Sequence, residues 1–177
     1  IVLPDAAEMR DISRKTGVQM TVAGNGSGVR ITANDLKLAT EIETKDHGIL
    51  TVRQIIGRGI TGKLRCHSPF RDSQSWAAFY SFNADGVPFV FDSGTNITHW
   101  LDEFEVPEVN LIRSDGTVTR LVEKVTGDSA AVLEKDAVAA LAILKDHNPA
   151  EYERKRASIK SANPKVSLAS MDRAVKA

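Results

Sequence analysis

The sequence predicts an α+β fold, in which a small antiparallel sheet of hairpins has flanking helices and is followed by a C-terminal helical segment. Short runs rich in β-branched and aromatic residues come in pairs around turns that contain Gly, Asn and Asp. Helix-capping signatures stand before several runs with helical spacing. From residue 127 the composition shifts to Ala, Leu, Val and Lys at helical period. We therefore expect an α+β domain over residues 1–126 and a helical segment over residues 127–177.

The first quarter of the chain predicts two helices around one hairpin. A capping box at residues 5–8 predicts a helix that runs to about Thr16. Two β-rich runs, residues 18–22 and 29–32, flank a turn rich in glycine and predict a hairpin. Thr32 follows as a candidate N-cap, and we expect a second helix from there to Gly48.

A further capping box, Thr51 with Gln54, predicts a short helix that Gly57 ends. The segment from Gly57 to Leu64 is close to a phosphate-binding loop, but Leu64 replaces the hydroxyl residue that would hold magnesium, and a helix rather than a strand precedes it. We expect no nucleotide or other cofactor there.

The middle of the chain is aromatic. Residues 75–82 and 87–91 predict two strands joined by an Asp-Gly turn, and Thr95 predicts a helix through residues 99–101. Aromatic side chains on a sheet can stack nucleic-acid bases. Acidic residues surround these strands, so we expect the aromatic side chains to form core, with Trp76 and Tyr80 as the exceptions to consider first.

The last third predicts another hairpin and then helices. Residues 110–113 and 117–122 have strand character around a Ser-Asp-Gly turn. Three helices should follow, over residues 129–145, from the capping box of Asn148 with Glu151, and over residues 167–176.

Composition sets limits on the function. The chain has 177 residues, 42% of them hydrophobic, and its 23 basic and 23 acidic side chains cancel, so no global field attracts nucleic acid or membrane. A single cysteine, Cys66, is typical of a reducing cytoplasm, and no apolar run approaches the ~20 residues that cross a bilayer. We expect a cytoplasmic protein without membrane contact. Because the chain does not begin with Met, we also expect a piece of a longer protein.

One segment resembles a known domain. A basic run leads into Ser-Pro-Phe-Arg at residues 68–71, a hairpin follows, and Asp-Ser-Gly at residues 92–94 precedes the predicted short helix. This order, over about residues 50–104, is similar to the zinc ribbon of bacterial and phage replicative primases. In that family two knuckles read Cys-Pro-x-His and Cys-x-x-Cys. The matching positions here are Ser68, Arg71, Val90 and Ser93.

None of these four side chains supplies the thiolate or neutral imidazole that structural zinc requires. The resemblance therefore implies a metal-free ribbon. We expect apolar packing to replace the metal between hairpin and helix, by the following side chains: Phe70, Val90, Phe91, Ile97 and Trp100.

The resemblance implies an accessory part of a phage, prophage or plasmid DNA replication protein of the primase-helicase kind. The C-terminal helices are similar to a helix-turn-helix or to the helical connector that precedes the motor in such proteins. A solvated basic helix that packs on the sheet or links domains remains an alternative for this segment.

Two basic stretches are candidates for contacts with phosphates of single-stranded or duplex DNA. Between Gly48 and Arg71 no acidic residue occurs, and a second cluster lies near the C-terminus. The candidates are Arg53, Arg58, Lys63, Arg65, Arg71, Arg154, Lys155, Arg156, Lys160 and Lys165. We expect reversal of the charges at Lys155, Arg156 and Lys160 to leave the fold intact. The alternative is a module that docks other domains or subunits of the larger replication protein.

No recognised catalytic motif is present. Candidate nucleophiles and bases are Cys66, Ser93, His67, His99 and Asp92, but Cys66 and His67 are adjacent on one strand and point to opposite faces. A metal site from Cys66 or His67 with His99 and Asp92 lacks a close pair of ligands. We assign no catalytic residue, no metal and no cofactor.

Overall fold

The computed structural model describes residues 18–22 and 29–176. The predicted helix over residues 5–16 lies outside the described residues. The chain divides into two compact units, the first made of Ile1–Gln54 and Thr61–Val106 and the second of Ile55–Ile60 and Pro107–Ala177. The main boundary is therefore near residue 106, whereas the expected one was residue 126.

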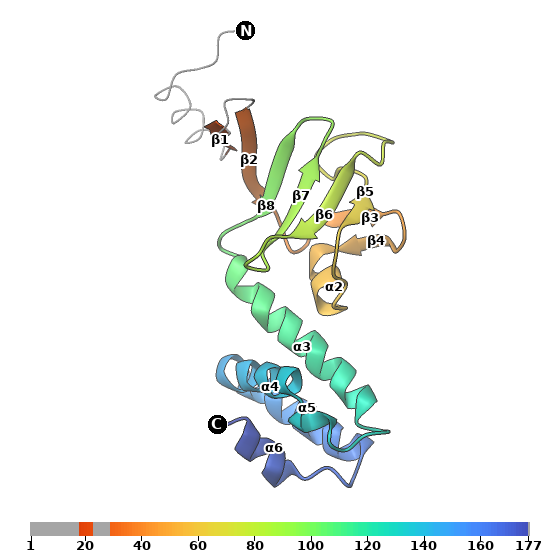
Figure 1. The fold of residues 1–177 in the computed structure, drawn as a ribbon, viewed down its shortest axis with the longest axis vertical. Coiled ribbons are helices and arrows are strands. Elements are labelled where there is room, and N and C mark those ends of the chain that lie inside the picture. Colours follow the sequence, from red (N-terminus) through yellow and green to blue (C-terminus); the bar gives the residue numbers. More distant parts are fainter. Residues whose placement is uncertain (1–17, 23–28, 177) are drawn as a thin grey trace. The chain divides into compact units, whose positions relative to one another are not determined.

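The first unit contains an eight-stranded sheet in its described part, with the order β1-β2-β8-β7-β6-β5-β3-β4. Neighbouring strands are antiparallel except β2 and β8, which pair in parallel. Figure 1 shows β8, β7 and β6 side by side. The strands are β1 (Val18–Val22), β2 (Val29–Leu36), β3 (Glu41–Thr44), β4 (Gly48–Thr51), β5 (Leu64–Cys66), β6 (Ala78–Phe82), β7 (Pro88–Asp92) and β8 (Ile97–Leu101).

The predicted α+β class is confirmed, and so are several local elements. Val22 pairs with Val29 and Val18 with Ala33, as the first hairpin requires. The aromatic hairpin is β6 with β7. At the start of α2 (Val52–Gly57) the capping box is reciprocal: Gln54 N donates to Thr51 Oγ1 at 3.2 Å, and Thr51 N donates to Gln54 Oε1 at 3.0 Å.

The expected helix between Thr32 and Gly48 is wrong. β2 continues to Leu36, and β3 and β4 form a hairpin in its place. Ile42 and Thr44 are buried while Glu41 and Glu43 are exposed, which is the period of two that a strand produces. The hairpin closes where Gly48 adopts φ +69°, a conformation that glycine accepts without strain.

The expected helix through residues 99–101 is also wrong, because residues 97–101 form strand β8. β7 and β8 are joined by a turn in which Asn96 has φ +58°, a left-handed conformation that Asn tolerates better than most residues. The turn returns the chain antiparallel to β7, with Asp92 opposite Ile97. The β-branched residues of this segment fit a strand.

The sheet of the first unit buries one face. Along β5 to β8 buried side chains alternate with partly or fully exposed ones. The buried face joins residues of β2, β3, β4 and α2 in an apolar core. Its members are Leu36, Leu38, Ile42, Leu50, Val52, Leu64, Cys66, Ala78, Tyr80, Val90 and Leu101.

The second unit is helical. The predicted hairpin over residues 110–122 is wrong, because this segment lies within helix α3 (Val106–Lys124). Thr117 and Thr119 suggested strands, but their hydroxyls donate to the carbonyls four residues earlier, at 2.9 and 2.8 Å. Val118, Leu121 and Val125 recur at helical spacing and are buried in the unit's core.

Three further helices follow α3, in agreement with the prediction: α4 (Lys135–His147), α5 (Pro149–Ala162) and α6 (Leu168–Ala174), with a short 3-10 helix (Ala131–Leu133) before α4. Asn148 caps α5 by accepting from Glu151 N at 3.1 Å, and Pro149 is the first helical residue. Their core contains Leu141, Leu144, Tyr152, Ile159 and Met171.

Candidate functional site

The exposed side of β5 to β8 is the candidate site, and we call it the outer face. It comprises Arg65, Phe79, Ser81, Phe89, Phe91, Thr98 and Trp100. Directly paired residues point to the same side of a sheet. The register aligns Arg65, Phe79, Phe91 and Thr98 in one line across the strands, and Ser81, Phe89 and Trp100 in the next.

Four rings of the outer face form a continuous chain of contacts, which we call the aromatic row. Phe91 and Phe79 have ring centroids 5.4 Å apart, Phe79 and Phe89 6.1 Å, and Phe89 and Trp100 4.9 Å. All four side chains are only partly buried. The aromatic row is therefore an apolar surface that retains access to solvent.

The charge of the outer face is positive. Arg65 is exposed beside Phe79, and the Lys63 ammonium lies 3.6 Å from the centroid of the Phe79 ring, within cation–π range. No residue at the described outward positions of β5 to β8 is acidic.

Acidic residues occur around the aromatic strands, between residues 72 and 105, but three of them have partners away from the outer face. Asp92 is paired with Arg71, Asp102 with Lys37, and Glu105 accepts from the backbone N–H of Leu38.

The loops after β5 and β7 are joined by a buried carboxylate. Asp92 is 1% exposed, and it accepts from Arg71 Nε at 2.6 Å, from Arg71 Nη2 at 3.1 Å and from Gly94 N at 2.8 Å. Burial by itself would raise the pKa of Asp92. The hydrogen bonds from Arg71, Ser68 and Gly94 outweigh it and lower the pKa to about 2. Arg71 thus holds two loops together.

Two of the positions that the resemblance assigns to zinc ligands, Ser68 and Arg71, converge on Asp92, which is the neighbour of the third, Ser93. The fourth, Val90, is fully buried in β7. Within the part of the chain that the structure describes, no three His, Cys, Asp or Glu side chains are grouped so that they could hold a metal ion.

The expected apolar replacement for the metal is divided between the two faces. Val90 is buried in the core, and Phe70 stacks on His99 with a centroid distance of 3.7 Å. Phe91 and Trp100 instead lie on the outer face, because they alternate with the buried Val90 and His99. The expectation that Phe91 and Trp100 fill the core is therefore wrong.

The candidate catalytic groups have structural partners. Cys66 is fully buried, and burial raises the pKa of its thiol to about 12, so it is not a thiolate at neutral pH. His99 Nδ1 contacts Asp35 Oδ1 at 2.9 Å. The rings of His67 and Trp76 are in tilted contact, with centroids 3.9 Å apart, and Ser93 Oγ donates to the Ala77 carbonyl.

The remaining N-terminal cations do not belong to the outer face. Arg53 lies on α2 and is exposed, and Arg58 is exposed after α2, in the segment that belongs to the second unit. The structure thus brings together two of the five predicted cations of this stretch, Lys63 and Arg65.

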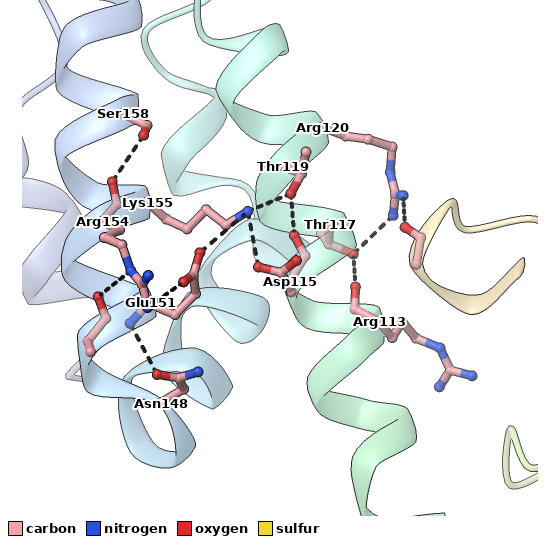
Figure 2. A network of polar contacts seen from close by, with 12 residues as sticks. Arg113, Asp115, Thr117, Thr119, Arg120, Asn148, Glu151, Arg154, Lys155 and Ser158 are labelled. Atoms are coloured by element: carbon pink, nitrogen blue, oxygen red, sulfur yellow. Dashed lines mark hydrogen bonds and ion pairs between the residues drawn. The ribbon is translucent and has the colours of Figure 1, made fainter. Parts of the chain in front are cut away.

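In the second unit, four of the five predicted phosphate-binding cations make internal contacts. Figure 2 shows Lys155 of α5 reaching toward α3. Its ammonium lies 3.0 Å from Asp115 Oδ1, 3.8 Å from Glu151 Oε1 and 2.7 Å from Thr119 Oγ1. Lys160 donates to the carbonyls of Pro164 and Val166 at 2.7 and 2.9 Å.

Arg156 joins α5 to α6 through Asp172. Its Nη2 lies 2.9 Å from Asp172 Oδ2, and Tyr152 OH donates to Oδ1 of the same carboxylate at 2.9 Å. The hydrogen bond from Arg156 lowers the pKa of Asp172, whereas burial and the contact with Asp172 raise the pKa of Tyr152 to about 12. Arg154, Lys160 and Lys165 are exposed, and Arg154 pairs with Glu151 of its own helix at 3.0 Å.

No protein-family model, no curated protein and no solved structure matches this chain. Among the described residues, none of the helices combines the length and the apolar character needed to cross a membrane.

The sequence identified the segment that forms this face, but it assigned the aromatic side chains of the strands to the wrong side of the sheet. Phe79, Phe89 and Phe91 were expected in the core, and Tyr80, considered as an exposed exception, is fully buried. The available signal was alternation, since Ala78, Tyr80, Val90 and Asp92 define the inward positions. Apolar residues stand at both the inward and the outward positions of these strands, and this obscured the alternation.

Proposed function

We propose that this chain is an accessory, non-catalytic nucleic-acid-binding module of a DNA replication protein of the primase-helicase kind, from a phage, prophage or plasmid. The replication context rests on the resemblance of residues 50–104 to the primase ribbon. The binding activity rests on the outer face.

The observation that carries the proposal is the charge of that face. Lys63 and Arg65 are cationic beside the aromatic row, and the described outward positions of β5 to β8 carry no acid. A phosphate backbone is attracted to such a surface, and each contact releases counterions, which makes the affinity depend on salt. Among the exposed C-terminal candidates, Arg154 and Lys165 are assigned the same role, whereas Lys160 is engaged by the carbonyls of Pro164 and Val166.

A salt series of binding to labelled single-stranded and duplex DNA tests the proposal. Replacing both Lys63 and Arg65 by Glu should weaken binding and flatten the plot of log affinity against log salt by about 0.7 per lost phosphate contact on single strands. The matched control replaces Lys135 and Lys176, which are exposed in the second unit, and changes the net charge equally. Equal effects of the two double variants would contradict a role for the outer face.

A docking module is the second candidate, and it is favoured by one observation. Phe104 is 84% exposed, which is unusual for a large apolar side chain. Absence of DNA and RNA binding even at low salt would refute the first proposal and leave docking within a larger replication protein as the function.

A further inference from the structure

We infer that the ligand of the outer face is single-stranded nucleic acid, whose unpaired bases stack on the aromatic row. This inference rests on the proposed nucleic-acid-binding function and adds to it the class of ligand and the mode of contact. The residues that carry it are Phe79, Phe89, Phe91 and Trp100, none of which was among the predicted binding residues.

The first step of the argument is the position of the rings. They stand on three adjacent antiparallel strands, where the pairs Phe79–Phe91 and Phe89–Trp100 lie directly opposite each other in register. Strands fix such side chains more firmly than loops do. The resulting apolar strip is partly exposed. Bases stack on such aromatic platforms irrespective of sequence, because every base has a π-face.

The second step is the charge beside the strip. Arg65 is the direct register partner of Phe79, and Lys63 lies over the same ring. Bases stacked on the row place their phosphates at its margin, within reach of long basic side chains. The Lys63 ammonium can exchange its contact with Phe79 for a phosphate, since lysine carries a compact charge on a flexible stem.

The third step distinguishes single strands from duplex. In a duplex the base faces are covered by neighbouring base pairs, and only edges and backbone are accessible in the grooves. A strip of exposed rings therefore finds no base face to stack on in a duplex. An exposed apolar sheet face without charge would equally suit a protein partner, but the two cations and the absence of acids at the described outward positions favour a polyanion.

The experiment uses the whole chain and an oligothymidylate of about 12 nucleotides, a length within the range of known single-strand sites. Phe91→Leu and Trp100→Leu keep apolar bulk but remove the ring. Each should lower the affinity for the single strand about ten-fold. The slope of log affinity against log salt should stay unchanged, because no phosphate contact is lost.

Phe104→Leu is the matched control, because it removes a more exposed ring that lies outside β5 to β8. It should leave the affinity unchanged. Thermal unfolding of every variant establishes that the fold is retained.

A spectroscopic measurement requires no change of the outer face. Trp76 and Trp100 are the two tryptophans of the chain. In a Trp76→Phe variant, Trp100 alone reports, and stacking of a base should quench its fluorescence in proportion to the fraction bound.

The outcomes separate this inference from the proposed function. Preference for the oligothymidylate over duplex, with quenching and with loss in both ring variants, supports stacking. Equal or tighter duplex binding, with ring variants that behave like the original chain, overturns the inference and leaves a phosphate-binding module. No binding to either probe at low salt overturns both.

Discussion

Arg71 and Asp92 form a two-point ion pair, with Nε 2.6 Å from Oδ2 and Nη2 3.1 Å from Oδ1. The carboxylate is buried, and the guanidinium is partly exposed. The pair joins the loop that follows β5 to the turn that follows β7. The ion pair is therefore a cross-link between the segment that contains Ser68 and the segment that contains Ser93.

Because of the ion pair, the unfolding free energy of the first unit should depend on pH in the acidic range. The pKa of Asp92 is lowered from 3.8 to about 2. Because the pKa of Asp92 is lower in the folded than in the unfolded protein, its ionised form stabilises the fold. This stabilisation is complete at pH values above the unfolded pKa and is lost as the pH falls from about 3.8 to about 2. A shift of this size corresponds to about 2 kcal/mol. Urea unfolding followed by tryptophan fluorescence reports this unit, because Trp76 and Trp100 both belong to it.

Replacement of Arg71 by Gln should shift the acid unfolding of the first unit to higher pH. The change leaves Asp92 buried without its cation, so the pKa of Asp92 rises and the unfolding free energy at neutral pH falls by about 2–4 kcal/mol. Lys37→Gln is the control, because it breaks an ion pair with Asp102 in which the lysine is exposed. Similar acid profiles for the two variants would refute the role given to Arg71.

Of two adjacent residues in β7, the smaller one should lose more unfolding free energy than the larger one when each is replaced by Ala. Val90 is fully buried, and Val90→Ala should lower the unfolding free energy by about 2–3 kcal/mol. Phe91 lies on the outer face, so Phe91→Ala should cost only about 1 kcal/mol, mainly through its contact with Phe79. Urea unfolding measures both, and a larger loss for Phe91→Ala would place that ring in the core.

Gly116 of α3 should tolerate no side chain. A Cβ at this position would lie 2.0 Å from the carbonyl oxygen of Gly57. Gly116→Ala should therefore destabilise the second unit by about 1–3 kcal/mol, despite the better helix propensity of Ala. Gly127→Ala is the control, since its Cβ would meet no atom within 4 Å. Thermal unfolding followed by circular dichroism distinguishes them, and equal midpoints would contradict the close packing at Gly116.

Charge reversal on α5 should have unequal effects on the fold, whereas the sequence alone led us to expect that reversal at Lys155, Arg156 and Lys160 would leave it intact. Arg156→Glu places a carboxylate beside Asp172 and breaks the link to α6, at a cost of about 1–3 kcal/mol. Arg154 is 70% exposed and pairs only with Glu151 of its own helix among the carboxylates described. Arg154→Glu should therefore change the unfolding free energy by less than about 0.5 kcal/mol. Helical circular dichroism during urea unfolding provides the measurement.

Local signals in the sequence were sufficient where neighbouring residues complete a structure by themselves. The reciprocal hydrogen bonds of Thr51 and Gln54, the cap of Asn148 and the β6–β7 hairpin all form between residues a few positions apart. They were therefore predictable from spacing and residue type.

The errors occurred where distant packing overrides local preference. Residues 97–101 lie in a strand because β2 and β7 pair with both of its edges, and α3 contains β-branched residues because its apolar stripe is buried in the second unit. Propensity is a weak force beside such burial, and the partners are distant in sequence.

The sequence by itself determined the fold class, the helical C-terminus and the positions of the cations. Only the tertiary structure decided which cations are engaged internally, as Arg71, Lys155 and Arg156 are, and which lie beside an aromatic surface, as Lys63 and Arg65 do. The physical reason is register: one residue of shift in a strand moves every side chain to the other face, so the aromatic row exists only through the pairing of β6, β7 and β8.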